Sequence, residues 1–129
     1  MFYVTRSVAE KMVQKRTRGV IVNISSVSAG GNAGQSAYSA AKAGVNALTA
    51  TWAQELGLLG IRVVGVAPGF TDTDSTHAAV TSDVLRNTIQ KVPLRRLGRP
   101  QEIAQCVLSV LQNDFITGTT LEIDGGLRL

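Results

Sequence analysis

The fold is decided by residues 20–48, which read VIVNISSVSAGGNAGQSAYSAAKAGVNAL. The run from Val20 to Ile24 is β-branched without alternation, which is typical of a strand buried on both faces of a parallel sheet. Ser25 and Ser26 end that strand, and a glycine-rich loop leads into a helical pattern over residues 36–56 that is rich in small side chains. A strand, a loop and a long helix in this order are typical of an α/β protein.

The patterns on both sides of this stretch extend the same arrangement. The further elements predicted are, in chain order, a helix over residues 2–17, a strand over 61–66 closed by a turn at Pro68 and Gly69, a helix over 79–89, a helix from Pro100 to Leu111, and a strand over 118–124. Their order predicts the carboxy-terminal half of a Rossmann-like, doubly wound parallel sheet, with three parallel strands and flanking helices. Three strands are few for such a sheet, and residues 20–24 would present an apolar edge if nothing paired with them.

The composition excludes several classes of function. The 129 residues are 44% apolar and 17% charged, as in a globular domain. The net charge is +4, but Lys and Arg are not gathered on one face, so we expect no nucleic-acid partner. One cysteine and one histidine exclude a disulfide framework and leave no cluster of soft metal ligands. No stretch is long enough to span a membrane and no leader opens the chain, so we expect a cytoplasmic protein without a membrane partner.

Tyr38 and Lys42 are the first candidates for chemistry. They lie four residues apart in the predicted helix, so their side chains share one face. A neighbouring ammonium stabilises a phenolate, which suits a tyrosine that acts as a general acid or base. The pair alone is weak evidence, because such spacings are frequent on solvated helix faces.

Hydroxyl groups follow both of the first two predicted strands. Ser25 and Ser26 end the first strand, and Thr71 and Thr73 follow the second beyond Pro68 and Gly69. Open α/β sheets bind ligands at the carboxyl ends of their strands, and a hydroxyl there can hold a carbonyl oxygen as charge develops on it. We therefore expect a site at this end of the sheet.

These motifs together resemble the short-chain dehydrogenase/reductase family over essentially the whole chain. The stretches that carry the resemblance are residues 24–26, the Y-x-x-x-K stretch 38–44, residues 67–69 with Thr73, residues 96–100 with Glu102, and residues 116–118 leading to 124–126. Five motifs in the family's order make the resemblance specific.

The resemblance implies an NAD- or NADP-dependent oxidoreductase that reduces a ketone or oxidises a secondary alcohol. Its catalytic residues would be Ser26, which holds the reacting oxygen, Tyr38, which transfers the proton, and Lys42, which assists Tyr38. By the same resemblance the cofactor-binding positions are Tyr38, Lys42, Pro68, Gly69, Thr71 and Thr73, and the substrate positions are Ser26 and Gln35. The implied partners are a small carbonyl or alcohol substrate and further copies of the chain in a dimer or tetramer.

The choice between Ser25 and Ser26 rests on the alignment. Ser26 matches the family's catalytic serine along the strand, but Ser25 restores the usual interval to Tyr38. We prefer Ser26, because a deletion in the loop at Gly30 and Gly31 is easier than a slip in a buried strand, which would turn every side chain to the other face.

Two further features narrow the resemblance. Val64 stands where many members carry Asn, and the segment 113–115 is shortened. Both features resemble type 2 3-hydroxyacyl-CoA dehydrogenases and 3-oxoacyl-(acyl carrier protein) reductases, which implies an acyl thioester substrate.

The family's dinucleotide-binding motifs would all precede Met1, and no G-x-G-x-x-G pattern occurs in the chain. We therefore expect residues 1–129 to be a single partial domain, the catalytic half of the fold, without the amino-terminal half and inactive alone. The alternative is a catalytically inactive module that oligomerises through the helices of residues 2–15 and 36–56 and the final helix and strand, which resemble the surfaces by which the family forms dimers and tetramers. Met1 falls where the family has a helix, which favours truncation.

Overall fold

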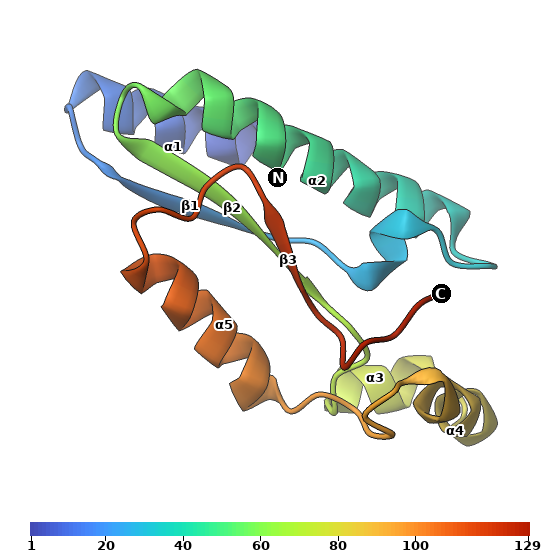
Figure 1. The fold of residues 1–129 in the computed structure, drawn as a ribbon. Coiled ribbons are helices and arrows are strands. Elements are labelled where there is room, and N and C mark those ends of the chain that lie inside the picture. The colour runs from blue at the N-terminus through green and yellow to red at the C-terminus, as the bar shows by residue number, and fades with distance from the viewer.

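The computed structural model describes all 129 residues and confirms the predicted α/β fold. Its elements are, in chain order, α1 (Phe2–Gln14), β1 (Gly19–Ile24), the 3-10 helix η1 (Val27–Gly30), α2 (Ser36–Gly57), β2 (Ile61–Pro68), α3 (Asp74–Ala79), α4 (Ser82–Lys91), α5 (Pro100–Gln112) and β3 (Thr120–Ile123). The strands form one parallel sheet in the order β1, β2, β3, with β2 in the centre (Figure 1).

Burial differs sharply between the two long strands. In β2 the side chains of Val63, Val64 and Val66 are fully buried, as a run without alternation predicts. In β1 only Asn23 is buried, while Ile24 is half exposed. The prediction that β1 is buried on both faces is wrong, because no strand pairs with its outer edge; the predicted apolar edge is present.

Helices cover both faces of the sheet (Figure 1). On one face lie α1 and α2, and here Trp52 of α2 packs against Val63 of β2. On the other face lies α5, whose Val110 packs against Val64 and Val66. Alternate residues of β2 thus face opposite layers, as the pleat of a strand requires.

Arg62 of β2 ties the sheet to the end of α5. Its guanidinium donates hydrogen bonds to the backbone oxygens of Val110, Ile116 and Leu111, at 3.1, 3.0 and 3.2 Å. A further bond of 3.3 Å reaches the carboxylate of Asp114. The last carbonyls of a helix have no partners within the helix, so this one side chain satisfies groups that would otherwise depend on water.

The predicted helix boundaries needed two corrections. The first helix ends at Gln14, short of residue 17, because Arg16 takes a left-handed φ of 53° and turns the chain. The helix expected over residues 79–89 is α4, which begins only at Ser82 after a cap at Thr81, and a separate short helix, α3, precedes it over residues 74–79.

The predicted turn at Pro68 and Gly69 is also wrong. Pro68 is the last residue of β2, and the Gly69 N–H donates to the backbone oxygen of Ile123 at 2.9 Å, so the pairing with β3 continues. The bend comes at Phe70. Glycine is needed at position 69 for another reason: a Cβ there would lie 2.7 Å from the Cα of Asp124.

Candidate active site

Tyr38 and Lys42 lie one turn apart near the start of α2, as their spacing predicts. Tyr38 is 47% exposed. The Lys42 Nζ lies 5.6 Å from the centroid of the Tyr38 ring and donates a hydrogen bond of 2.9 Å to the backbone oxygen of Ile24. The end of β1 therefore holds the ammonium beside the phenol ring.

A cavity of about 290 Å³ opens where β1 and β2 end. Its lining residues are Ser26, Val27, Ser28, Gln35, Tyr38, Gly69, Phe70, Thr71, Ser75, Thr76, Ala79 and Val80. The structure thus brings together five of the residues expected from the sequence, namely Ser26, Gln35, Tyr38, Gly69 and Thr71. Lys42, Pro68 and Thr73 do not line the cavity.

The two serines at the end of β1 have different surroundings. Ser25 is 3% exposed, and its hydroxyl donates to the backbone oxygen of Lys42 at 3.3 Å. Ser26 lines the cavity, and its Oγ accepts a hydrogen bond of 3.2 Å from the backbone N–H of Ser28. Ser26 therefore faces the cavity and Ser25 does not, while the catalytic role of Ser26 stays a prediction.

Gln35 is held in place by two residues that the sequence did not single out. Its Oε1 accepts hydrogen bonds from the Ser28 hydroxyl and from Asn32 Nδ2, both at 3.1 Å. Ser28 is buried, and it also accepts a bond from Asn32 at 3.3 Å. The serine two positions after Ser26 was a visible signal, but only the fold brings it to Gln35.

Of the two threonines expected at the site after β2, only Thr71 lines the cavity. The Thr71 hydroxyl donates to the Gly69 backbone oxygen at 3.1 Å while its residue lines the cavity. Thr73 instead caps α3, where its Oγ1 accepts a bond of 3.2 Å from the Thr76 N–H. The Thr73 side chain therefore has a structural role here, and its cofactor role stays a prediction.

Close to this segment, Glu102 on the first turn of α5 binds two arginines. One carboxylate oxygen accepts from Arg96 at 2.7 Å and from the Arg99 side chain at 3.1 Å, and the other accepts from Arg96 and from the Arg99 N–H, both at 2.8 Å. The Arg96 hydrogen bonds first, and then those of Arg99, hold the pKa of the Glu102 carboxyl well below its usual range.

We expect the contribution of Glu102 to stability to depend on pH. A carboxyl whose pKa is lower in the folded state stabilises the protein above the unfolded pKa of about 4.3, and the contribution is lost as the pH falls toward the folded value. Glu102→Gln should therefore lower the free energy of unfolding at pH 7, and the difference from the wild type should shrink below about pH 4. Urea unfolding of both proteins at several pH values measures this; a difference that does not change with pH would contradict it.

Other reactive groups are sparse. No three His, Cys, Asp or Glu side chains are placed to share a metal ion. Cys106 packs against the cluster of Val64, Val66 and Val110, and burial raises the pKa of its thiol. No helix combines the length and the apolar character needed to cross a bilayer.

A comparison with known families identifies the family of the chain. A family model described as enoyl-(acyl carrier protein) reductase matches residues 1–128. The chain belongs to the short-chain dehydrogenase/reductase family. The family predicted from the five sequence motifs is thereby confirmed, and the members of this family are oxidoreductases.

Two relatives match the branches that the sequence suggested. The 3-oxoacyl-(acyl-carrier-protein) reductase of Thermotoga maritima is 42% identical over 130 residues, covering 98% of this chain and 52% of the relative. The 3-hydroxyacyl-CoA dehydrogenase type-2 of Mycobacterium avium superposes with a TM-score of 0.88 at 35% identity, covering 99% of this chain and 52% of that one.

A third relative is a solved structure of a 7α-hydroxysteroid dehydrogenase in complex with NADH and 7-oxo glycochenodeoxycholic acid. It superposes with a TM-score of 0.91 at 32% identity, and the match covers 99% of this chain and 51% of that chain. The chain thus spans about half the length of the short-chain dehydrogenase/reductases it matches.

Proposed function

We propose that residues 1–129 are the catalytic half of an NAD- or NADP-dependent oxidoreductase that interconverts a ketone and a secondary alcohol. The observation that supports it most is the placement of Ser26 and Tyr38 on one cavity, with Lys42 beside the Tyr38 ring. A 3-oxoacyl or 3-hydroxyacyl thioester is the proposed substrate class, because the similar proteins of Thermotoga maritima and Mycobacterium avium bear such names.

In the proposed reduction, each residue has one task. A nicotinamide cofactor held near Tyr38, Lys42 and Thr71 would supply hydride chemistry at the carbonyl carbon. Ser26 donates a hydrogen bond from its Oγ to the carbonyl oxygen and stabilises the charge that develops there. Tyr38 delivers the proton from its Oη to that oxygen, and the Lys42 ammonium stabilises the phenolate that remains. Oxidation runs through the same groups in the opposite direction.

The residues of the chain fit only part of a dinucleotide. The Tyr38 hydroxyl, the Lys42 ammonium and the polar segment at Thr71 supply donors for a ribose and a carboxamide. A pyrophosphate needs a glycine-rich loop before a helix, and no G-x-G-x-x-G pattern occurs in these 129 residues. We therefore propose that the dinucleotide-binding half lies outside residues 1–129 and that this chain alone does not turn over.

The two serines give a direct test of the proposed roles. In the protein expressed from its complete gene, Ser26→Ala should lower kcat/KM about 10²-fold, because it removes one donor to the developing oxyanion. Ser25→Ala should leave turnover unchanged and lower the free energy of unfolding by about 1 kcal/mol, because it removes one buried hydrogen bond. Steady-state kinetics with NADH, NADPH and 3-oxoacyl thioesters measures the first effect. Loss of turnover in Ser25→Ala instead would assign catalysis to Ser25.

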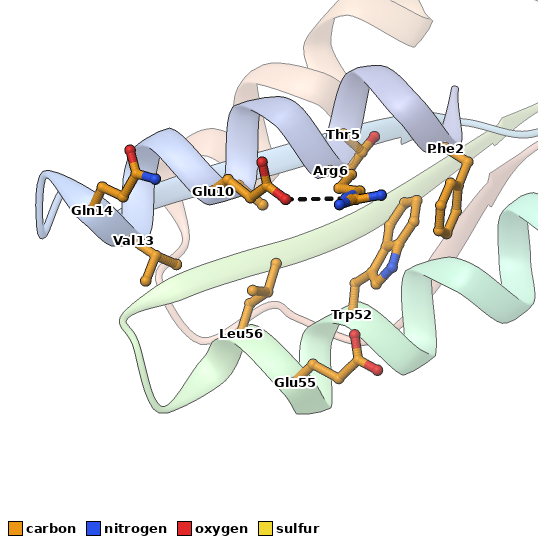
Figure 2. A pocket seen from close by; sticks show the side chains of 10 residues that line it. Phe2, Thr5, Arg6, Glu10, Val13, Gln14, Trp52, Glu55 and Leu56 are labelled. Atoms are coloured by element: carbon orange, nitrogen blue, oxygen red, sulfur yellow. Dashed lines mark hydrogen bonds and ion pairs between the residues drawn. The ribbon is translucent and has the colours of Figure 1, made fainter.

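A second candidate function, an oligomerisation module, rests on a groove of about 460 Å³ between α1 and α2. In Figure 2, Phe2 and Val13 of α1 and Trp52 and Leu56 of α2 line this groove, and Arg6 pairs with Glu10 beside them. None of the expected catalytic residues lies here. The proposed occupant is a second copy of the chain, because apolar helix faces of this kind suit a self-complementary contact.

Mass and cofactor binding separate the two candidates. A sample of 13.6 kDa chains that associate but bind neither NADH nor NADPH would support the module. A larger polypeptide that binds a cofactor would support the enzyme. Native mass spectrometry followed by cofactor fluorescence on the same sample distinguishes these outcomes.

A further inference from the structure

The polypeptide leaves the cavity after β2, makes an excursion through α3 and α4, and returns to the point where it left. The returning residue is Gly98, which forms a parallel bridge with Thr71. Its N–H donates to the Phe70 backbone oxygen at 2.9 Å, and its backbone oxygen accepts from the Asp72 N–H at 2.8 Å. The position of Thr71 at the cavity therefore depends on the position of Gly98.

A single carboxylate binds a residue on each side of Gly98. Glu102 binds Arg96 on one side of Gly98 and Arg99 on the other, through four hydrogen bonds between 2.7 and 3.1 Å. Charge-assisted bonds with both oxygens engaged are stronger and more directional than neutral ones. The Glu102 side chain is only 24% exposed, although both arginines are more exposed.

Capping α5 does not account for all of these bonds. A cap at the start of α5 needs only the bond between Glu102 and the Arg99 N–H. The bidentate pair with Arg96 is not itself a cap bond, because Arg96 lies outside the helix. This pair instead fixes the course of the chain just before Gly98.

We propose that Glu102 is a positioning residue of the active site, which holds Gly98 so that the Gly98 peptide fixes Thr71 at the cavity. The inference rests on the proposed function, since it is the nicotinamide end of the cofactor that the Thr71 segment would receive. Glu102 acts through backbone and touches no reacting atom.

The first test measures amide hydrogen exchange by NMR in the wild type, Glu102→Ala, Glu102→Gln and Glu10→Gln. The reporters are the N–H groups of Asp72 and Gly98, and the reference is the Gly69 N–H, which bonds to Ile123. In Glu102→Ala the two reporters should exchange about tenfold faster relative to the reference. Glu102→Gln keeps the shape and part of the hydrogen bonding, so it should show a smaller increase.

Glu10→Gln is the matched control, because Glu10 also pairs with an arginine on a helix, at 3.0 Å, but far from the cavity. It should leave both reporters unchanged. Faster exchange confined to the first-turn amides of α5, with Asp72 and Gly98 unchanged, would overturn the inference and reduce Glu102 to a helix cap.

The second test measures NADH binding by fluorescence in the protein expressed from its complete gene. Glu102→Ala should raise the Kd for NADH about tenfold, and Glu10→Gln should not change it. If the wild type binds NADH and Glu102→Ala binds it with the same Kd, the inference is overturned. A wild type that binds neither NADH nor NADPH would contradict the proposed function, whereas the exchange experiment would still decide whether Glu102 holds the Thr71 segment.

Discussion

Tyr38→Phe is expected to lower kcat about 10³-fold, because it removes the only group proposed to transfer the proton to the substrate oxygen. The free energy of unfolding should stay within about 0.5 kcal/mol of the wild type, since Tyr38 is half exposed and only its hydroxyl is lost. The measurement is the rate of NAD(P)H consumption in the protein expressed from its complete gene, together with urea unfolding of both proteins.

Tyr3→Phe is the matched control for this variant. Tyr3 is 80% exposed on α1 and does not line the cavity. Its substitution removes the same hydroxyl group from a different place. It should leave kcat unchanged. If Tyr38→Phe kept more than about a tenth of the activity, another group would have to supply the proton.

Arg62→Ala should lower the free energy of unfolding by about 3 kcal/mol, the largest effect on stability expected of any single change considered for this chain. The side chain is only 15% exposed and donates to the backbone oxygens of Val110 and Leu111 in the last turn of α5 and of Ile116 beyond it. Its removal leaves the backbone oxygens of Val110 and Ile116, whose bonds to Arg62 are partly buried, without this donor. Urea unfolding followed by circular dichroism measures the loss.

Arg6→Ala provides the comparison for Arg62. Arg6 makes one exposed ion pair with Glu10, so its removal should change the free energy of unfolding by about 0.5 kcal/mol or less. Equal effects of the two substitutions would show that the bonds between Arg62 and α5 contribute little.

Much of the fold could be predicted because the strands carry strong local signals. The run Ile61–Val66 and the spacing of apolar residues in α2 identify those elements without knowledge of their neighbours. The short helix α3 was missed because it lies in a polar segment without periodicity and depends on a cap at Thr73. The exposure of β1 could not be seen in its own residues, because it depends on what lies beside the strand.

The candidate site was predictable for a different reason. Spacing places Tyr38 beside Lys42 in any helix, and strand ends place Ser26 and Thr71 at one edge of a parallel sheet. Contacts within the loops were not predictable. The bonds that Glu102 accepts from Arg96 and Arg99, and the bond that Ser28 donates to Gln35, depend on how the loops fold.

The parallel sheet also has a consequence for the kinetics of folding. Each of its pairings joins residues far apart in the sequence, such as Ile24 with Val66 and Val66 with Leu121. Such contacts form slowly, because the long loops must close before any pairing is gained. During synthesis β2 lacks its second partner until residues 120–123 have been made. In that interval one edge of this apolar strand is open to pairing with other chains.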